Sequence, residues 1–329
     1  MLNDKTILIT GGTGSFGKKC VEIILKRYKP KKIIIFSRDE LKQFEMQKMF
    51  SDTEYPCLRY FIGDVRDRER LYRAFHNVDY VIHAAALKQV PAAEYNPSEA
   101  IRTNVTGAEN VINVAIDSKV KKVLAISTDK AVNPINLYGA TKLCAEKLFV
   151  AANSYATEPT RFSVVRYGNV AGSRGSVLWT FAARKSSGTI PITDERMTRF
   201  WMTIAQGVNF SLSCLGKMHG GEIFVPRVPS IKIKDLAQAM CPGASIEVVG
   251  IRPGEKLEEV LISKDEARMT LDMASFFVIQ PSFPFWHYEN WRDGSPLPED
   301  YEYTSANNSL WLGVDQLKEI IEFTIPELK

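Results

Sequence analysis

The residues best suited to chemistry are a tyrosine and a lysine four positions apart, Tyr138 and Lys142. In a helix this spacing places both side chains on one face. A lysine cation there favours the phenolate and so lowers the pKa of the tyrosine. Such a tyrosine can take a proton from a hydroxyl group while a hydride leaves the same carbon for a nicotinamide. The spacing is common by chance, but here it follows an expected strand that ends in Ser127-Thr128-Asp129-Lys130.

A glycine-rich turn lies near the start of the chain, with Gly11, Gly14 and Gly17 spaced three apart. It falls between an expected buried strand at 6–10 and an expected helix at 14–28. Glycines let a pyrophosphate approach the backbone, and the free N–H groups at a helix start favour its negative charge. The spacing alone is also typical of a tight structural turn. Its position between the first strand and the first helix predicts a dinucleotide site.

The residues after the second expected strand, at 32–36, indicate which dinucleotide binds. An acidic residue there would hold the ribose 2′-hydroxyl of NAD, whereas a basic one accommodates the 2′-phosphate of NADP. Ser37 occupies the acidic position, Arg38 follows it, and Lys42 lies about one helical turn later. We therefore expect NADP. Asp39 keeps a second interpretation open, as either a partner of the NAD ribose or a helix cap.

Two further strand ends add to the expected cleft. Asp64 follows the third strand, where its carboxylate can accept a hydrogen bond from the adenine amino group or cap a helix. His83 precedes Ala84, Ala85 and Ala86, whose small side chains keep the floor of the cleft open. Because apolar residues flank His83, we expect a structural histidine rather than a catalytic one.

An α/β framework is needed to position these residues. Apolar runs at 6–10, 32–36, 58–62, 78–83, 122–126 and 161–166 alternate with helical patterns at 14–28, 40–50, 67–75, 104–118 and 138–156. Such alternation implies a Rossmann-type, doubly wound parallel sheet covered on both faces. We predict a dinucleotide-binding domain at 1–168, with a return near 202–230. Residues 169–329 are expected to form mainly a smaller, irregular substrate domain.

Composition excludes several classes of protein. The 329 residues are 45% hydrophobic and 24% charged, as in an ordinary soluble globular protein. The net charge of +4 is too mild to argue for nucleic acid, and no apolar run is long enough to span a bilayer. Five scattered cysteines and four histidines predict neither a disulfide framework nor a metal site. No signal peptide is evident, so we expect a cytoplasmic protein.

Taken together, these motifs resemble the extended short-chain dehydrogenase/reductase superfamily of nucleotide-sugar enzymes. Within it the chain is very similar to the configuration-inverting UDP-N-acetylglucosamine 4,6-dehydratases of the pseudaminic acid pathway type. The similarity covers nearly the whole chain and is weakest at about 264–300. The most specific stretch is 127–144, because its string is not general to the superfamily. The other matching stretches are 10–17, 36–43, 61–67, 83–97, 163–177, 191–201, 219–226 and 250–259.

The resemblance implies a lyase that removes water from UDP-N-acetylglucosamine without net redox change. Tyr138, helped by Lys142, would deprotonate the C4 hydroxyl as C4 is oxidised. Lys130 resembles the base that takes the C5 proton, and Asp129, next to Thr128, resembles the acid that helps the C6 hydroxyl leave. We expect nearby positive charge and burial to lower the pKa of Lys130. Hydride return to C6 and inversion at C5 would give UDP-2-acetamido-2,6-dideoxy-β-L-arabino-hex-4-ulose.

The resemblance also assigns binding residues and an assembly. It implies a homo-oligomer, a hexamer, and it places Met202 in the wall of the substrate site or in the core. Arginines suit diphosphate anchoring because their planar forks bind phosphate oxygens bidentately. The residues expected at NADP are Gly11, Thr13, Gly14, Ser15, Phe16, Gly17, Ser37, Arg38, Lys42, Asp64, Val65, Ala84, Ala86, Lys88, Asn104, Tyr138, Lys142 and Val170. Those expected at the UDP-sugar are Lys88, Asn169, Arg174, Gly175, Ser176, Val177, Arg199, Met202, Arg252 and Glu255.

Some positions depart from the family pattern, and two other functions stay open. Gln89 and Glu258 stand where these enzymes often have histidine, which puts the fine sugar selectivity in doubt. The aromatic stretch 283–291 is interpreted as local packing, with an oligomer contact or a lid as alternatives. A UDP-sugar 4-epimerase would not need the Asp129-Lys130 pair. A non-enzymatic dinucleotide sensor would be expected to lack Tyr138 and Lys142.

Overall fold

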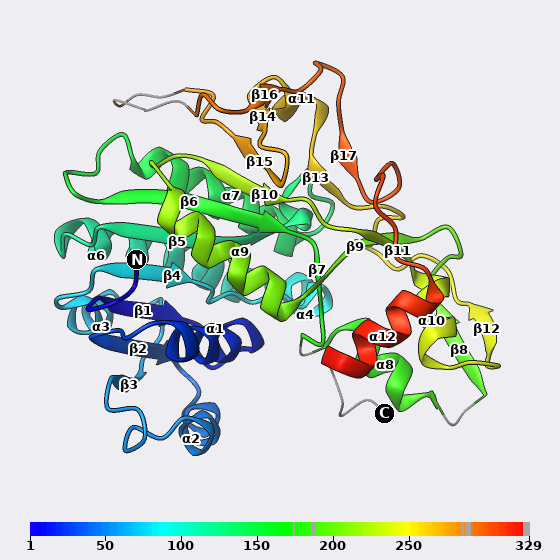
Figure 1. The fold of residues 1–329 in the computed structure, drawn as a ribbon, viewed down its shortest axis with the longest axis horizontal. Helices are drawn as coiled ribbons and strands as arrows, with labels where there is room; N and C mark the ends of the chain where they lie inside the picture. The colour runs from blue at the N-terminus through cyan, green and yellow to red at the C-terminus, as the bar shows by residue number, and fades with distance from the viewer. Residues whose placement is uncertain (174, 186–187, 284–285, 287–290, 325–329) are drawn as a thin grey trace.

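The computed structural model describes residues 1–173, 175–185, 188–283, 286 and 291–324. Its largest element is a ten-stranded sheet in the order β16-β14-β15-β10-β6-β5-β4-β1-β2-β3 (Figure 1). The run from β10 to β3 is parallel, and β15, β14 and β16 extend it in antiparallel pairing. The strands are β1 (Thr6–Thr10), β2 (Lys32–Ser37), β3 (Leu58–Ile62), β4 (Tyr80–His83), β5 (Lys122–Thr128), β6 (Arg161–Tyr167), β10 (Ile223–Pro226), β14 (Thr270–Asp272), β15 (Phe276–Ile279) and β16 (Ser295–Pro296).

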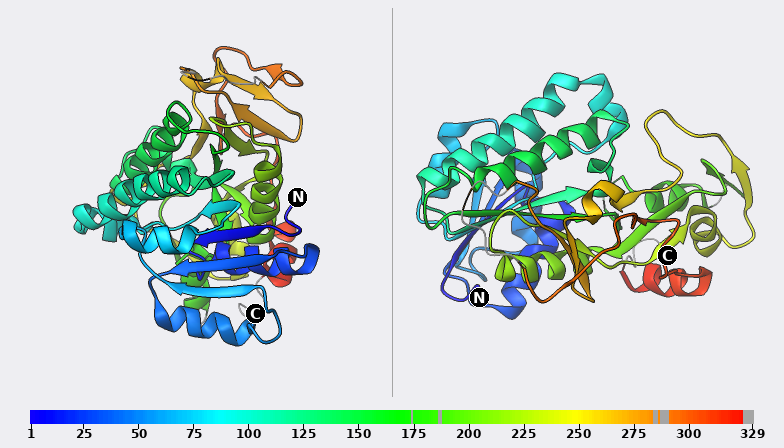
Figure 2. Two further views of the ribbon diagram at one scale, coloured as in Figure 1. Left: turned by 90° about the vertical axis from the view of Figure 1, so that its left-hand side faces the viewer. Right: turned by 90° about the horizontal axis from the view of Figure 1, so that it is seen from above.

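Helices cover both faces of the parallel part, as Figure 2 shows from two further directions. One layer pairs α1 with α9, and the opposite layer is formed by α3, α6 and α7. Both layers bury apolar side chains against the nearly continuous apolar strands, which forms the main core. The helical segments of this part are α1 (Ser15–Arg27), α2 (Glu40–Met49), α3 (Arg68–Phe75), α4 (Val90–Tyr95), α5 (Pro97–Ile101), the π-helical turn η1 (Arg102–Thr106), α6 (Gly107–Asp117), the 3₁₀ turn η2 (Asp129–Ala131), α7 (Leu137–Ala152) and α9 (Ile204–Lys217).

A smaller lobe with its own apolar core lies beside the carboxyl ends of the strands (Figure 1). Its sheets are β11-β9-β7 and β12-β8, and a further pair joins β13 to β17. The strands are β7 (Asn169–Ala171), β8 (Thr189–Ile192), β9 (Thr198–Thr203), β11 (Ser230–Lys232), β12 (Ser245–Val248), β13 (Val260–Ile262) and β17 (Tyr303–Thr304). The helices of this half of the chain, apart from α9, are α8 (Val177–Ala183), α10 (Ile233–Met240), α11 (Lys264–Ala267) and α12 (Val314–Thr324).

The doubly wound α/β architecture predicted from the sequence is confirmed. The six predicted strands and five predicted helical regions are present within a few residues, except that the helix expected from Asn104 begins as the turn η1. The antiparallel extension β14–β16 was not predicted, because these strands are only two to four residues long. In the described part of the chain, no helix is both long and apolar enough to cross a membrane.

Candidate active site

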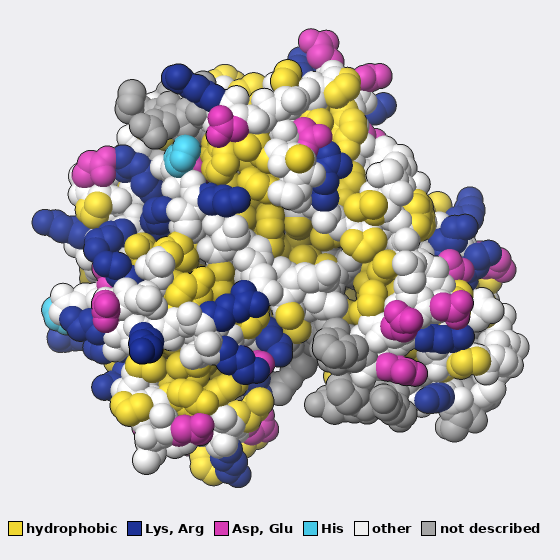
Figure 3. Space-filling model, viewed as in Figure 1, with side chains coloured by type: hydrophobic (Ala, Val, Ile, Leu, Met, Phe, Trp, Pro, Cys, Tyr) yellow, Lys and Arg dark blue, Asp and Glu magenta, His cyan; other side chains and the backbone are white. Residues whose placement is uncertain are grey.

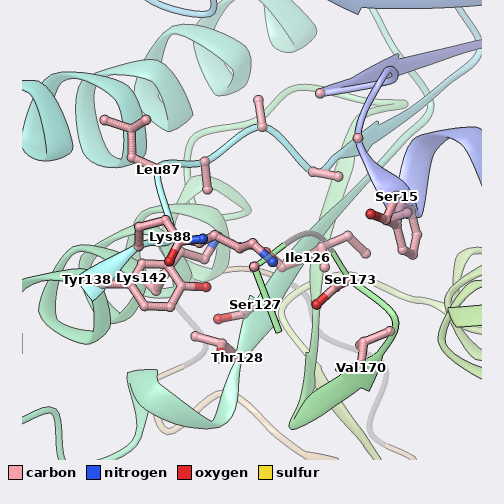
Figure 4. A pocket seen from close by; sticks show the side chains of 18 of the residues that line it. Ser15, Leu87, Lys88, Ile126, Ser127, Thr128, Tyr138, Lys142, Val170 and Ser173 are labelled. Carbon is pink, nitrogen blue, oxygen red and sulfur yellow. The ribbon is translucent and has the colours of Figure 1, made fainter. Parts of the chain in front are cut away.

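A cleft of about 670 Å³ opens at the carboxyl ends of the parallel strands. Ligands of open α/β sheets bind at this edge because the connections to the helices diverge there. Figure 4 shows Tyr138 and Lys142 on one side of the hollow and Ser15 across it. The predicted site residues that line the cleft are Gly11, Thr13, Gly14, Ser15, Phe16, Ser37, Arg38, Lys42, Asp64, Val65, Ala84, Ala86, Lys88, Thr128, Asp129, Lys130, Tyr138, Lys142, Asn169, Val170, Gly175, Ser176 and Val177.

The glycine turn has no room for side chains at two of its three predicted positions. Gly11 has a φ of +65°, and a Cβ there would lie 2.9 Å from the backbone of Ala84. A Cβ at Gly17 would collide with the backbone of Gly12, so Gly17 allows close packing of α1 on the turn and does not line the cleft. Helix α1 starts at Ser15 with no side-chain cap from Gly14. Its first N–H groups are therefore suited to holding phosphate oxygens.

The predicted adenosine end carries basic side chains. Arg38 is 52% exposed, and Nη1 lies 3.6 Å from Oδ2 of Asp64. Arg66 binds the same carboxylate through Nε and Nη2 at 3.0 and 2.7 Å. Burial by itself would raise the pKa of Asp64, but Arg66 and Arg38 outweigh burial and lower that pKa. Asp39 accepts a hydrogen bond from the backbone N–H of Lys42 and caps α2, which agrees with the helix-cap interpretation.

Basic side chains also gather over a wider area near this end. Figure 3 shows Lys and Arg side chains on the part of the face that lies over α1 and the neighbouring strands. Such a local excess of positive charge raises the local concentration of an anionic ligand. It is compatible with a dinucleotide even though the net charge of the chain is small.

The Tyr–Lys pair lies on the first turns of α7, as its spacing predicted. Asn136 caps this helix by accepting from the Gly139 N–H at 2.8 Å. A Cβ at Gly139 would collide with the carbonyl of Lys130, so glycine lets α7 pack directly on η2. This contact brings the Tyr–Lys pair and the Asp129-Lys130 pair to the same corner of the cleft.

The electrostatics of the pair differ from the expectation. The Lys142 ammonium donates to the carbonyl of Ile126 at 2.7 Å, and burial lowers its pKa to about 8. Burial raises the pKa of Tyr138 to about 12, although Lys130 and a hydrogen bond with Thr128 act in the opposite direction. In the unliganded chain the pKa of Tyr138 is therefore raised and not lowered as expected, and the cation that opposes the rise is Lys130.

Lys130 lies between two carboxylates. Its Nζ is 3.0 Å from Oδ1 of Asp129 and 3.1 Å from Oε1 of Glu259. Burial by itself would lower the pKa of Lys130, but Asp129 and Glu259 outweigh burial and raise that pKa. The expected lowered pKa is therefore wrong for the unliganded chain, in which Lys130 is an ammonium. The sequence analysis did not assign a role to Glu259.

Several buried polar atoms around the cleft have no hydrogen-bond partner within the described residues. Unpaired buried polar atoms are costly, so they are typical of sites that bind a polar ligand. Those belonging to residues that line the cleft are Oγ1 of Thr103, Oγ of Ser127, Oδ2 of Asp129, Oδ1 of Asn169, Oγ of Ser176 and Nε1 of Trp201. The predicted UDP-sugar residues Asn169 and Ser176 are thus placed to accept or donate hydrogen bonds.

Two residues predicted to contact the substrate are structural. Arg199 is 7% exposed, and its guanidinium donates to the carbonyls of Thr198, Lys256 and Leu257 at 2.7 to 3.2 Å. Those bonds occupy the guanidinium fork that was expected to anchor the diphosphate or the ribose. Met202 is 3% exposed and belongs to the main core, which agrees with the core alternative and removes Met202 from the substrate-binding set.

The remaining predicted residues lie outside the lining of the cleft. Asn104, in the π-helical turn, binds the backbone N–H and carbonyl of Leu87 at 2.8 and 2.9 Å and so positions the segment that carries Lys88. Arg252 is exposed, with Nη1 3.9 Å from Oε1 of Glu255. Arg174 lies outside the described residues, as does most of the aromatic stretch predicted at 283–291.

Sequence reasoning missed several contributors to the site, including a glutamate, a tryptophan and a glycine. Glu259, Trp201 and Gly168 all lie in or next to stretches that carried the family resemblance, but none has a spacing that indicates its role. A Cβ at Gly168 would lie 3.2 Å from Oδ2 of Asp129 and 2.6 Å from Cβ of Phe200. For Gly168 the signal in the sequence was a glycine directly after an expected strand, and such glycines are too common to indicate a functional site.

His83 has the structural role expected of it. It is buried, its Nδ1 shares a hydrogen bond of 2.8 Å with Oγ1 of Thr10, and burial followed by Lys142 lowers its pKa to about 3. Within the described residues, no group of three or more His, Cys, Asp or Glu side chains is placed to hold a metal ion.

Comparison with known sequences identifies close relatives. The profile of the family described as polysaccharide biosynthesis protein matches residues 7–281. A protein from Campylobacter jejuni named UDP-N-acetylglucosamine 4,6-dehydratase (inverting) is 54% identical, over 98% of this chain and 99% of its own. A protein from Rickettsia massiliae named UDP-glucose 4-epimerase is 41% identical, over 100% of this chain and 99% of its own.

Solved structures with the same architecture agree with these matches. The X-ray structure of Pen from Bacillus thuringiensis is 38% identical, covers 100% of both chains and superposes with a TM-score of 0.91. The DesIV dTDP-glucose 4,6-dehydratase from Streptomyces venezuelae, solved with NAD and TYD bound, is 22% identical. It covers 77% of this chain and 86% of its own, with a TM-score of 0.68, and shows a shared fold alone.

Proposed function

This chain belongs to the polysaccharide biosynthesis protein family, and from that premise we propose that it is an inverting UDP-N-acetylglucosamine 4,6-dehydratase. The observation that carries the proposal is the meeting of Tyr138, Lys142, Asp129 and Lys130 in one corner of a dinucleotide-type cleft. A tyrosine–lysine pair suits oxidation at a sugar carbon, and an adjacent acid–base pair suits elimination. The Campylobacter relative, 54% identical over nearly the full length, bears the same name.

We infer that the cleft holds NADP as a reusable hydride carrier. The close approach of Gly11 to the backbone of Ala84 and the open start of α1 provide the cradle for a pyrophosphate. The structure with the same fold from Streptomyces venezuelae holds NAD, which supports a nicotinamide dinucleotide. Arg38, exposed at the end of β2 and 3.6 Å from its carboxylate neighbour, favours the 2′-phosphate of NADP.

The chain's own residues move the protons. A nicotinamide held in this cleft would supply temporary hydride storage, between the removal of hydride from C4 and its return to C6. The lysine cation of Lys142, whose pKa is about 8, supports the phenolate form of Tyr138, and this phenolate takes the proton of the C4 hydroxyl and becomes a neutral phenol. The ketone at C4 then acidifies the proton on C5, which makes elimination across C5 and C6 feasible.

Asp129 and Lys130 supply the acid and the base of the elimination. Transfer of one proton across their 3.0 Å contact converts ammonium and carboxylate into amine and carboxylic acid. The amine takes the C5 proton, the carboxylic acid protonates the departing C6 hydroxyl, and water leaves. The pair is then again ammonium and carboxylate. Reprotonation of C5 from the opposite face inverts that centre.

A UDP-sugar 4-epimerase is the second candidate, because the 41% identical Rickettsia relative carries that kind of name over its full length. An epimerase needs the Tyr–Lys pair and the cofactor but no acid–base pair for water loss. The ammonium–carboxylate contact at Asp129-Lys130 therefore favours the dehydratase.

One experiment separates these functions. Purified protein is incubated with UDP-N-acetylglucosamine in deuterium oxide, and proton NMR spectra are recorded early. The dehydratase gives a C6 methyl group that keeps the hydrogen from C4, solvent deuterium at C5, and the L-arabino configuration. A C4 epimer that retains its C6 hydroxyl would identify an epimerase. An early product with only the D-xylo configuration would remove the inverting assignment, and early sampling matters because a 4-keto sugar epimerises at C5 spontaneously.

A further inference from the structure

A buried glutamate lies beneath the acid–base pair and outside the lining of the cleft. Glu259 is 2% exposed, and its Oε1 lies 3.1 Å from Nζ of Lys130. The same oxygen is 3.8 Å from Nε of Arg199. Its other oxygen, Oε2, has no hydrogen-bond partner within the described residues. The carboxylate therefore faces two cations, one of which is the proposed base.

The backbone, rather than Lys130, determines where this carboxylate lies. The N–H of Glu259 donates to Oγ of Ser305 at 2.9 Å, and its carbonyl accepts from the Ser305 N–H at 2.8 Å. Arg199 holds the carbonyls of Lys256 and Leu257, just before Glu259, at 3.0 and 3.2 Å. Lys256 in turn donates from Nζ to the carbonyl of Val132, in the segment that follows Lys130. The loop before β13 is thus attached to the segment that carries the base.

The contact between Glu259 and Lys130 matters during the proposed reaction because the charge of Asp129 changes. The proposed cycle has Asp129 alternate between carboxylate and carboxylic acid. Whenever Asp129 is protonated, Glu259 is the remaining carboxylate in contact with Lys130 within the described residues. A lysine has a long, flexible stem, so without an anchor its nitrogen would leave the position from which it reaches the sugar.

We propose that Glu259 is a positioning residue that anchors the Lys130 nitrogen through the whole cycle and sets how readily it gives up its proton. This inference rests on the proposed role of Lys130 as the C5 base. A buried carboxylate at 3.1 Å stabilises the ammonium form, so it delays formation of the amine until Asp129 takes the proton. Other charged or titratable groups that act on Lys130 from neighbouring elements are Asp129, Arg199, Lys88, Tyr138 and Lys256.

The first test measures the fraction of Lys130 that is the free amine, and it needs no substrate. Competitive labelling with acetic anhydride at a series of pH values, followed by peptide mass spectrometry, reports how much of each lysine is the free amine. In Glu259→Gln the amide keeps the shape but loses the charge, which favours the free amine, so Lys130 should label about tenfold faster at the same pH. Glu258→Gln is the matched control, because Glu258 is exposed and binds Thr304 instead. Equal labelling of Lys130 in both variants and the wild type would overturn the proposal.

The second test uses the reaction, and it separates this inference from the proposed function. In Glu259→Gln the acid-side inflection of the dehydration rate should move to lower pH, because Lys130 loses its proton more easily. C4 oxidation, followed as reduced cofactor, should persist. Faster labelling in a protein that shows no dehydration would support the ionic contact and reject the proposed activity. An unchanged inflection with an active enzyme would reject the role of Glu259.

A third measurement covers failure of the glutamine variant to fold. In the wild-type protein, Lys130 should label more slowly than Lys88 at every pH, because burial and Lys130 lower the pKa of Lys88, whereas Asp129 and Glu259 raise that of Lys130. Glu259→Asp retains the charge and should keep Lys130 slow. Labelling of Lys130 as fast as that of Lys88 in the wild type would overturn the proposal without any variant.

Discussion

The proposed chemistry depends on a few titratable side chains whose environments shift their pKa values in opposite directions. Lys142 is buried beside a backbone carbonyl, and burial lowers its pKa to about 8, whereas Lys130 lies between two carboxylates, which raise its pKa. Two lysines in one cleft thus have different proton affinities, and their roles in the proposed reaction differ accordingly. Opposed environments of neighbouring titratable groups are typical of acid–base sites.

The steps assigned to Tyr138 and Lys130 can be separated by substitution. Tyr138→Phe removes the proton acceptor at C4, so bound cofactor should not become reduced when UDP-N-acetylglucosamine is added. Lys130→Ala should still permit this reduction but should stall water loss, because the C5 proton has no base. Absorbance of the reduced nicotinamide and the NMR methyl signal report the two steps. Normal dehydration by Lys130→Ala would contradict its assigned role.

The choice between NADP and NAD is also expected to depend on a single residue, Arg38. Arg38→Ala should remove a charge-assisted phosphate contact of roughly 1.5–3 kcal/mol, which weakens NADP about tenfold to a hundredfold. Affinity for NAD, which lacks the 2′-phosphate, should change little and serves as the control. Titration calorimetry measures both affinities. Equal binding of the two cofactors by the wild type would show that the interpretation of Ser37 and Arg38 is wrong.

At the scale of elements, one arginine joins α7, β6 and α11. Arg166 is 1% exposed and binds Glu146 of α7 at 2.7 Å and Glu266 of α11 at 2.8 Å. Its Nη1 also donates to the carbonyl of Leu261 at 3.0 Å. Glu146 lies one turn beyond Lys142 on α7, so this cluster holds the helix that presents the Tyr–Lys pair.

Removing that arginine should be costly because the buried carboxylate of Glu146 and the half-buried carboxylate of Glu266 would lose the cation between them. We expect Arg166→Met to lower the free energy of unfolding by about 3–5 kcal/mol, measured by urea denaturation. Arg196→Ala is a control, since Arg196 pairs with Asp194 at the surface and should contribute little. A similar, small effect for both variants would show that the cluster is not a structural tie.

A second prediction at this scale concerns the contact between β1 and β4. The pKa of His83 is lowered by burial, then by Lys142, to about 3, from its ordinary value of 6.5. Between these pH values the unfolded chain binds a proton at this residue that the folded chain does not bind. Stability should therefore fall as the pH decreases through this window, by up to about 1.4 kcal/mol per pH unit.

The measurement is urea unfolding of the wild type and of His83→Gln from pH 7 to pH 3. The variant should lose less stability on acidification, because its side chain does not titrate. Other groups titrate in both proteins, so the difference between the two slopes isolates His83. Identical slopes would show that protonation of His83 does not lower the free energy of unfolding.

For the whole molecule, the smaller lobe completes the site and offers a surface for assembly. The loop before β13 brings Glu259 to the proposed base, and β9 places Trp201 in the lining of the cleft. Side chains on and after β12 form an exposed apolar row: Ile246, Val248, Val249 and Ile251 are 42 to 53% exposed. Apolar groups at a strand edge are typical of contacts between chains.

We therefore expect copies of this chain to associate. Light scattering should give a mass that is a multiple of the 37.0 kDa chain. Replacing Ile246 and Val248 together by Lys should reduce that mass, whereas Phe44→Lys on α2, also exposed, should not. A wild-type mass equal to that of a single chain would contradict the expected homo-oligomer.

The amino-acid sequence by itself determined the fold class, the family and most of the cleft. Periodicity located six strands and their helices because each element buries a continuous apolar face, and that signal is local. The turn at Gly11 and the pair Tyr138 and Lys142 are local signals too, because the residues of each motif lie close together along the chain. The fold class and the family resemblance were both confirmed.

Only the tertiary structure decided which distant groups meet. Arg199 was expected at the diphosphate or the ribose, but its guanidinium fork is occupied by the carbonyls of the loop at 256–257. Glu259 was assigned no role, yet it lies 3.1 Å from Lys130 and, with Asp129, raises the pKa of that residue. Spacing along a chain does not report such contacts. The charge of a buried lysine depends on the carboxylates that the fold brings to it.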